Sequence, residues 1–263
     1  MKLDNSISAV ITGGASGLGR ASAYALASAG VKVAIFDLNE EWGAKVAEDT
    51  GGSFHKVNIL DEASVEEGFA AARAAQGQER ILVHCAQVSK GARTISKDKE
   101  TGGWKRFSTE DYAFSAQGIL IASYRMASLS ALGMASLDPL EDGERGCITL
   151  TASVAAQDAQ IGLAGRGAFV QHGGGPPRRR GRDRRALATR SNPITPGIFP
   201  PPPMLAVKDR SPAIWDGLNA SVPFPKRLGK PEEFGSLILE LNRNTYFNGQ
   251  NLRLDGAIRM PPR

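Results

Sequence analysis

Short runs of apolar, largely β-branched residues recur along the chain and alternate with longer segments of mixed character. Runs of this length and composition are typical of strands that are buried on both faces. They occupy residues 9–11, 31–36, 53–57, 80–83, 146–150 and 252–254. The intervening segments predict helices at residues 20–29, 40–48, 61–75, 111–134 and 212–218, and a last helix that begins at residues 230–233. This alternation predicts an α/β protein with one doubly wound parallel sheet and helices on both of its faces.

A glycine-rich loop connects the first predicted strand to the first predicted helix. Gly13, Gly17 and Gly19 have the spacing Gly-x-x-x-Gly-x-Gly, and Ser16 and Leu18 lie between them. Glycines allow the backbone to approach a phosphate closely, and the helix N-terminus offers unpaired N–H groups and the positive end of its dipole. We therefore predict that these residues bind a pyrophosphate. An ordinary strand-to-helix turn is the alternative, because the spacing differs from the commoner Gly-x-Gly-x-x-Gly fingerprint.

The second predicted strand ends on an acidic residue, Asp37, about 20 residues beyond the glycine loop. A carboxylate at this place can accept hydrogen bonds from both hydroxyls of an adenosine ribose. It would also repel a phosphate on the 2′-oxygen of that ribose, and no Arg lies beside it in the sequence. The cofactor predicted by Asp37 is therefore NAD rather than NADP.

The loop spacing, Asp37 at a strand end and the short chain together resemble the short-chain dehydrogenase/reductase family. Within it, the chain is similar to the 3-hydroxyacyl-CoA dehydrogenase type 2, or multifunctional hydroxysteroid dehydrogenase, subgroup. The stretches that carry this similarity are KETG at 99–102, LDPLEDGERG at 137–146, TASVAA at 151–156, TPGIF at 195–199, SVPFPKRLGKPEEF at 221–234 and LRLDGAIRM at 252–260. The resemblance implies one Rossmann-type domain over residues 1–263, with a surface insertion at 88–110. It also implies an NAD-dependent enzyme that interconverts a secondary alcohol and a ketone of 3-hydroxyacyl-CoA or hydroxysteroid type.

The resemblance adds further cofactor-binding positions. Asn58 and Ile59 stand where the family has Asp-Val against the adenine. Cys85-Ala86-Gln87 stand where the family has Cys-Ala-Gly or Ala-Gly, so Gln87 replaces a glycine and we expect local distortion there. The preceding residue, His84, is interpreted as a core histidine, or as one that supports the site from behind, rather than as a catalyst. Pro196, Gly197 and Ile198 match the loop that meets the nicotinamide carboxamide.

The catalytic positions of the family are only partly conserved in this chain. Ser153 follows a predicted strand and matches the catalytic serine, with a helix-capping or loop serine as the alternative. The family's tyrosine and lysine fall at Arg166 and Val170, so the general acid/base and the partner that lowers its pKa are missing. The chain has no Tyr between residues 124 and 246 and no Lys between residues 105 and 208. The helix asparagine that holds a relay water in the family falls at Ile119.

Residues 164–191 depart from the family pattern. Three glycines and two prolines at 173–177 are followed by a run of Arg. Gly and Pro destabilise a helix interior by about 1 and about 3 kcal/mol, so we expect irregular structure where the family has a core helix. Three interpretations remain open: a compensated pair of frame errors in a GC-rich gene, a basic loop without a partner, and a nucleic-acid-binding segment. The last has little support, because Phe169 is the only aromatic residue there to stack on bases.

Composition and charge limit the remaining possibilities. Residues 161–195 hold eight Arg and one Asp, which is a net charge of +7. Because the whole chain has a net charge of +5, the rest of the chain is slightly acidic. Cys85 and Cys147 lie in apolar runs and are predicted to be free thiols. The N-terminus is polar, and no apolar run is expected to approach the ~20 residues of a membrane span.

These observations predict an intracellular protein, placed in the cytoplasm, with the mitochondrial matrix as an alternative. The expected partner is a small acyl-CoA or steroid-like substrate, with no membrane, metal or nucleic acid. The resemblance implies a homotetramer. Because the catalytic Tyr and Lys are absent, a catalytically impaired NAD-binding homologue that acts as a scaffold remains the alternative function.

Overall fold

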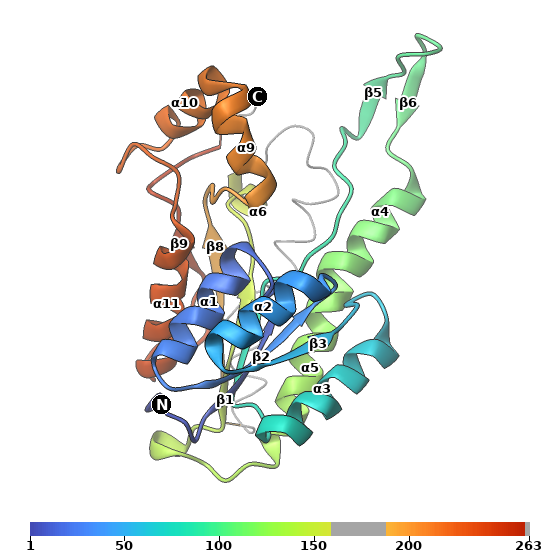
Figure 1. Cartoon of the computed structure of the whole chain (residues 1–263). Coiled ribbons are helices and arrows are strands. Elements are labelled where there is room, and N and C mark those ends of the chain that lie inside the picture. Colours follow the sequence, from blue (N-terminus) through green and yellow to red (C-terminus); the bar gives the residue numbers. More distant parts are fainter. Residues whose placement is uncertain (159–187, 261–263) are drawn as a thin grey trace.

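Seven strands form one parallel sheet at the centre of the molecule (Figure 1). The computed structural model describes residues 1–158 and 188–260, without the side chains of 202, 203 and 207. The strand order is β3-β2-β1-β4-β7-β8-β9, and all the neighbours pair in parallel. The strands are β1 (Ser8–Thr12), β2 (Lys32–Asp37), β3 (Ser53–Lys56), β4 (Ile81–His84), β7 (Gly146–Thr151), β8 (Thr189–Pro196) and β9 (Leu252–Leu254). The predicted α/β class and the doubly wound parallel sheet are confirmed.

Helices cover both faces of this sheet because successive strand residues point to opposite faces, and both faces are apolar. Ala9 and Ile11 of β1 pack with α1 (Gly17–Ser28), α2 (Glu40–Thr50) and α11 (Pro231–Arg243). Val10 packs on the other face with α3 (Glu62–Gln76) and α5 (Ala122–Ala135). The first two turns of α3 are stabilised by Asp61, whose carboxylate accepts from the N–H groups of Ala63 and Ser64, as the capping pattern predicts.

The remaining elements lie at the carboxyl edge of the sheet or connect the strands at its other edge. They are β5 (Ile95–Lys97), β6 (Trp104–Arg106), α4 (Thr109–Ala116), the π-helical turn η1 (Gln117–Ile121), the 3-10 turn η2 (Glu141–Gly143), α6 (Ala155–Asp158), α9 (Pro202–Arg210) and α10 (Pro212–Ala220). The predicted surface insertion contains the antiparallel hairpin β5–β6, which projects from the molecule beside α4 (Figure 1).

A continuous helix runs from Thr109 through η1 to Ala135. Among the residues that the structure describes, it is the one helix long and apolar enough to cross a membrane. Half of its most apolar window is buried, and Met126, Ala127 and Ala131 pack in the core beneath the sheet. By length and composition, this helix contradicts the prediction that no apolar run approaches a membrane span. Its packing is that of a core helix.

One expectation about residues 164–191 is wrong, because strand β8 includes the last of these residues. The prediction that residues 164–191 are irregular is wrong for residues 189–191, which are buried and paired with β7. The rest of that segment, up to residue 187, lies outside the described residues. The strand was missed because it is polar and contains Pro193 in its interior. Pro193 is tolerated there because β9 pairs with β8 only from Ile194 onward.

Arg190 of β8 connects three distant parts of the chain. Its side chain is buried, and Nε lies 2.7 Å from a carboxylate oxygen of Glu144, which is also buried. The same guanidinium donates to the carbonyl oxygens of Leu241 (2.6 Å) and Asn242 (3.1 Å) in the last turn of α11. These carbonyls have no partner within the helix, and a cation at this end also interacts favourably with the helix dipole.

We predict that Arg190→Ala lowers the free energy of unfolding by about 3–5 kcal/mol. It removes the arginine partner of the buried Glu144 carboxylate, which keeps only the N-terminal ammonium at 3.2 Å, and it removes the donors to the terminal carbonyls of α11. Arg243→Ala, which removes an exposed arginine from the same helix end, should change stability by less than about 0.5 kcal/mol. Urea unfolding of both variants measures the difference. Equal effects would contradict the role given to Arg190.

Candidate active site

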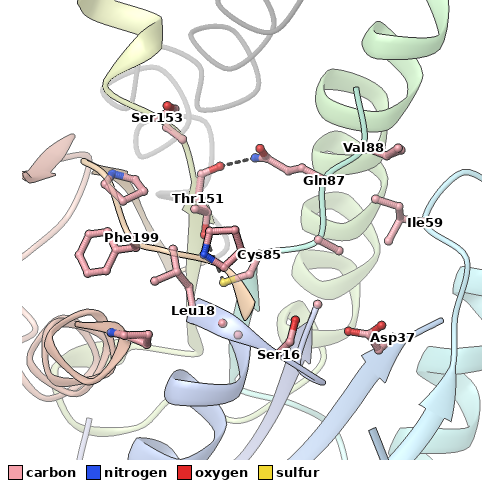
Figure 2. A pocket seen from close by; sticks show the side chains of 18 of the residues that line it. Ser16, Leu18, Asp37, Ile59, Cys85, Gln87, Val88, Thr151, Ser153 and Phe199 are labelled. Carbon is pink, nitrogen blue, oxygen red and sulfur yellow. Dashed lines mark hydrogen bonds between the residues drawn. The ribbon is translucent and has the colours of Figure 1, made fainter. Parts of the chain in front are cut away.

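A cavity of about 870 Å³ lies at the carboxyl edge of the sheet, where loops from six of the strands converge (Figure 2). Open α/β sheets bind ligands at this edge, at the point where successive strands begin to be added in the opposite direction along the sheet. In this sheet that point lies between β1 and β4. Every site residue predicted from the sequence that the structure describes lines this cavity. These residues are Gly13, Ser16, Gly17, Leu18, Gly19, Asp37, Asn58, Ile59, Cys85, Ala86, Gln87, Ser153, Pro196, Gly197 and Ile198. Arg166 and Val170 lie outside the described residues.

The glycine loop is packed tightly on one side and open on the other. Gly13 has φ +65°, and a Cβ there would come within 2.9 Å of the Ala86 backbone nitrogen. A Cβ at Gly19 would overlap the carbonyl oxygen of Gly13. At Gly17, by contrast, a Cβ would meet no atom within 4 Å. The N-cap residue of α1, Ser16, makes no side-chain capping bond, so the first N–H groups of the helix are available to an anion.

Asp37 joins the end of β2 to the glycine loop. One carboxylate oxygen accepts from the N–H of Ala15 at 3.1 Å, and the other accepts from the N–H of Asn39 at 3.0 Å. No Lys or Arg within residues 1–158 and 188–260 forms an ion pair with it, and it lines the cavity (Figure 2). A carboxylate with lone pairs to spare and no compensating cation can accept from ligand hydroxyls and disfavours a nearby phosphate.

The loop after β3 forms the adjoining wall. The side-chain oxygen of Asn58 accepts from the N–H of Leu60 at 3.1 Å, and its backbone N–H donates to Ser64. Asn58 therefore holds the turn before α3, which leaves its NH₂ group without a partner in the described part of the chain. Arg125 of α5 donates to the carbonyl oxygen of Ile59 at 2.7 Å and fixes this loop against the helix.

Thr12 joins β1 to the end of β4. Its Oγ1 lies 3.2 Å from the backbone nitrogens of both Cys85 and Ala86 and 2.7 Å from Nδ1 of His84. The Cys85 N–H is shared, since it also donates to the carbonyl oxygen of Thr12 at 3.1 Å. His84 is fully buried, which lowers its pKa to about 4 and keeps it neutral at pH 7. The interpretation of His84 as a core histidine is confirmed.

The strand that precedes Gln87 is regular. The pairing of β4 with β7 continues in register as far as His84 opposite Leu150. The Gln87 side chain lines the cavity, and its Nε2 donates to the carbonyl oxygen of Thr151 (Figure 2). The chain can pass here because η1 has Gly118 at the contact, where a Cβ would overlap the Val88 carbonyl oxygen.

Ser153 lies just beyond β7, at the upper end of the cavity in Figure 2. Its Oγ accepts from the N–H of Ala155 at 3.2 Å, at the start of α6. Ser153 therefore holds the turn that leads into α6, and this leaves its hydroxyl proton available to a ligand oxygen. Ile119, where the family has an asparagine, is buried against Ala152 beneath Ser153.

Titratable side chains are sparse around Ser153. Among the described residues that line the cavity, they are Asp37, which lies towards the other end, and Cys85. Burial raises the pKa of the Cys85 thiol to about 12, and the thiol accepts a hydrogen bond from Oγ1 of Thr151 at 3.3 Å. At neutral pH the Cys85 thiol therefore stays protonated and cannot act as a base.

The far wall of the cavity is apolar and includes a residue near the C-terminus. Its members are Val154, Ile198, Phe199, Pro200, Pro201, Met204 and Met260. Met260 is held by its N–H, which donates to Asp158 at the end of α6 at 3.1 Å. Arg253 makes paired hydrogen bonds of 3.1 and 3.0 Å to the same carboxylate and holds the pKa of Asp158 below its usual range. Sequence analysis missed this network, since its partners lie about a hundred residues apart.

The order of the parallel strands, the open helix N-terminus behind a glycine loop and the acid at the end of β2 define a dinucleotide-binding α/β protein. A family model described as short chain dehydrogenase matches residues 8–168. The chain belongs to the short-chain dehydrogenase family, whose members are oxidoreductases.

Individual relatives agree with this assignment and with the predicted subgroup. The 3-hydroxyacyl-CoA dehydrogenase type-2 of Drosophila melanogaster is 34% identical over 99% of this chain and 100% of its own length. The human protein of the same name is 33% identical over 97% of this chain and 95% of its own. The crystal structure of 3-hydroxyacyl-CoA dehydrogenase type-2 from Mycobacterium avium superimposes with a TM-score of 0.90, at 32% identity and with full coverage of both chains. The resemblance inferred from the sequence motifs is confirmed.

We predict that His84 makes the stability of the protein depend on pH. Because its pKa is about 4 in the folded chain and 6.5 for an ordinary histidine, the unfolded chain binds a proton between these values that the folded chain does not. The stability that the protein gains by keeping His84 neutral is therefore complete above about pH 6.5 and is lost as the pH falls towards 4. Between pH 7 and pH 5 the free energy of unfolding should fall by about 2 kcal/mol more than in His84→Asn. Urea unfolding at both pH values tests this, and parallel pH profiles would contradict it.

Proposed function

We propose that the protein binds NAD(H) and belongs functionally with dehydrogenases that interconvert a secondary alcohol and a ketone. The observation that carries this proposal is Asp37, which lines the cavity beside an uncapped helix N-terminus and has no cationic partner among the described residues. In this proposal the pyrophosphate lies at the N-terminus of α1 and the adenosine ribose at Asp37. The adenine lies between Asn58 and Ile59, and the nicotinamide lies near residues 196–198. Bound NAD would accept or supply the hydride.

Ser153 is the one catalytic residue that we assign. Its hydroxyl proton is available, because its oxygen accepts only the Ala155 N–H among the described residues. By donating to the substrate oxygen, the hydroxyl would polarise a ketone or orient an alcohol. The backbone beside it is fixed, since the N–H of Val154 donates to the carbonyl oxygen of Pro196 at 3.1 Å.

The substrate class that we propose is 3-hydroxyacyl-CoA or hydroxysteroid. The apolar wall formed by Ile198, Phe199, Met204 and Met260 suits an acyl chain or a steroid skeleton rather than a sugar. The names of the relatives from Drosophila melanogaster and human support the acyl-CoA alternative. We further propose a homotetramer in the cytoplasm. Tyr124 and Leu132 of α5, which are 66% and 72% exposed, provide apolar surface for such an assembly.

Among the described residues that line the cavity, none has the family's role in the proton transfer that must accompany hydride transfer. The position of the family's tyrosine holds Arg166, whose guanidinium stays protonated at any working pH. The position of the lysine holds Val170, and Ile119 replaces the relay asparagine. These replacements favour the second candidate function, in which the protein binds NAD but turns over substrate poorly and acts as a scaffold.

We predict that the protein binds NADH at least about tenfold more tightly than NADPH. The 2′-phosphate of NADPH would lie against the unpaired carboxylate of Asp37, and like charges in contact are strongly unfavourable. The double variant Asp37→Ala/Leu38→Arg should relax this preference, and fluorescence titration with both cofactors measures it. Asp37→Asn is the matched control, because it removes the charge but keeps an oxygen for the Ala15 N–H. Tighter binding of NADPH by the unmodified protein would contradict the assignment.

We also predict that NADH binding persists while turnover is nearly absent. General acid/base catalysis contributes about 10²–10⁴-fold, so acetoacetyl-CoA reduction should be at least about 10⁴-fold slower than in an intact relative measured alongside. Mass spectrometry of the same preparation must first establish Arg166 and Val170. Ser153→Ala should leave the NADH dissociation constant within about twofold. Robust turnover by the protein with Arg166 and Val170 would overturn this account.

The double change Arg166→Tyr/Val170→Lys provides a second test of the same idea. The surrounding residues include three glycines, two prolines and several arginines, which disfavour the helix on which the family carries both side chains. We therefore expect this variant to remain inactive. Sequencing the gene across codons 160–195 tests whether frame errors produced the segment, and clean in-frame reads would exclude that interpretation.

A further inference from the structure

Gln87 stands at a cofactor-binding position of the family, but the proposed function gives no role to its side chain. It follows β4, three residues beyond the end of the strand, at a position where the family resemblance predicts glycine. Its side chain lines the cavity and points towards Thr151 at the end of β7 (Figure 2). A long side chain in this place reduces the space for a ligand, so it must either obstruct the ligand or contact it.

The orientation of the Gln87 carboxamide is fixed by a hydrogen bond. Its Nε2 donates to the backbone carbonyl oxygen of Thr151. A carbonyl oxygen can only accept, so the NH₂ group must face Thr151 and the carboxamide oxygen must be directed elsewhere. No described residue donates to this oxygen, Oε1. The side chain therefore presents a hydrogen-bond acceptor whose direction is set by the bond to β7.

The sheet order determines which part of a bound dinucleotide lies near this acceptor. Along the edge of the sheet, the ends of β2, β1, β4 and β7 follow one another, with neighbouring strands about 4.8 Å apart. Asp37 lies at the end of β2 and the glycine loop at the end of β1, whereas Ser153 follows β7. With the first ribose at Asp37 and the pyrophosphate at the loop, the next group along the edge is the second ribose, which carries the nicotinamide. It lies over the end of β4, where Gln87 is.

We propose that Gln87 binds a hydroxyl group of the ribose that carries the nicotinamide, through its carboxamide oxygen. This inference rests on the proposed function, because it assumes that the cavity accepts NAD. Oγ1 of Thr151 donates to Cys85, and the hydroxyl proton of Ser153 is assigned to the substrate oxygen in the proposed function. Gln87 is thus a positioning residue that sets the nicotinamide end of the cofactor relative to Ser153.

Three ligands that differ by one part of the cofactor test this proposal. ADP contains the adenosine ribose and the pyrophosphate, ADP-ribose adds the second ribose, and NADH adds the nicotinamide. Dissociation constants for all three are measured by calorimetry on the full-length protein and on Gln87→Met, which keeps the volume of the side chain but neither polar group. The expected result is that Gln87→Met binds ADP-ribose and NADH about 3- to 12-fold more weakly. Its dissociation constant for ADP should stay within about twofold of that of the unmodified protein.

Gln250→Met is the matched control. Gln250 also donates through its side chain to a backbone carbonyl, that of Asn248, but it is exposed and does not line the cavity. The variant Gln250→Met should bind all three ligands as the unmodified protein does. Unchanged ADP binding by Gln87→Met also shows that the variant is folded, since the glycine loop and Asp37 must be in place for it.

Two outcomes would overturn the inference without affecting the proposed function. In one, Gln87→Met binds all three ligands as the unmodified protein does, so Gln87 makes no productive contact. In the other, Gln87→Met weakens the binding of ADP as much as the binding of ADP-ribose, so Gln87 acts only through the packing of β4 against β7. A different result, in which the unmodified protein binds neither ADP nor NADH, would overturn the proposed function itself, and the inference with it.

Discussion

The close contact between β1 and β4 at the carboxyl edge of the sheet is the constraint on which the site depends. The hydroxyl of Thr12 accepts from the N–H groups of Cys85 and Ala86, and Gly13 approaches Ala86 so closely that a side chain would not fit. Because β1 leads into the glycine loop and β4 leads to Gln87, this contact sets the distance between the two ends of the cavity. Everything that a dinucleotide would touch is positioned relative to it.

Two arginines extend this organisation to segments that the sheet alone would not hold. Arg190 binds the last turn of α11 and the carboxylate of Glu144, so it attaches the helix that covers one face of the sheet. Arg253 binds Asp158, which in turn holds the residues before the C-terminus at the cavity wall. Both arginine side chains are at least partly buried and are held in a defined geometry. Hydrogen bonds in which one group is charged are stronger than hydrogen bonds between neutral groups.

The predicted site positions divide into three groups according to how their residues compare with the family pattern. The glycine loop and Asp37, which would hold the adenosine half of the cofactor, match it and have the geometry to bind. The positions that would move a proton hold Arg166, Val170 and Ile119 instead. Gln87 is a third kind of change, in which a new polar side chain enters the cavity and is fixed by a neighbouring strand. Our proposal that binding outlasts chemistry follows from this division.

The sequence by itself determined the fold class, most of the strands and helices, the glycine loop and Asp37. These features depend on local patterns: the spacing of apolar residues, the glycines of one loop and an acid at a strand end. The tertiary structure alone decided that a polar segment containing Pro193 is an interior strand, because its polar groups find partners in a loop some fifty residues away. It also decided that Gln87 turns towards Thr151 without disturbing β4, since Gly118 leaves room for the backbone to pass. Both outcomes depend on contacts between residues distant in the chain, which no local pattern encodes.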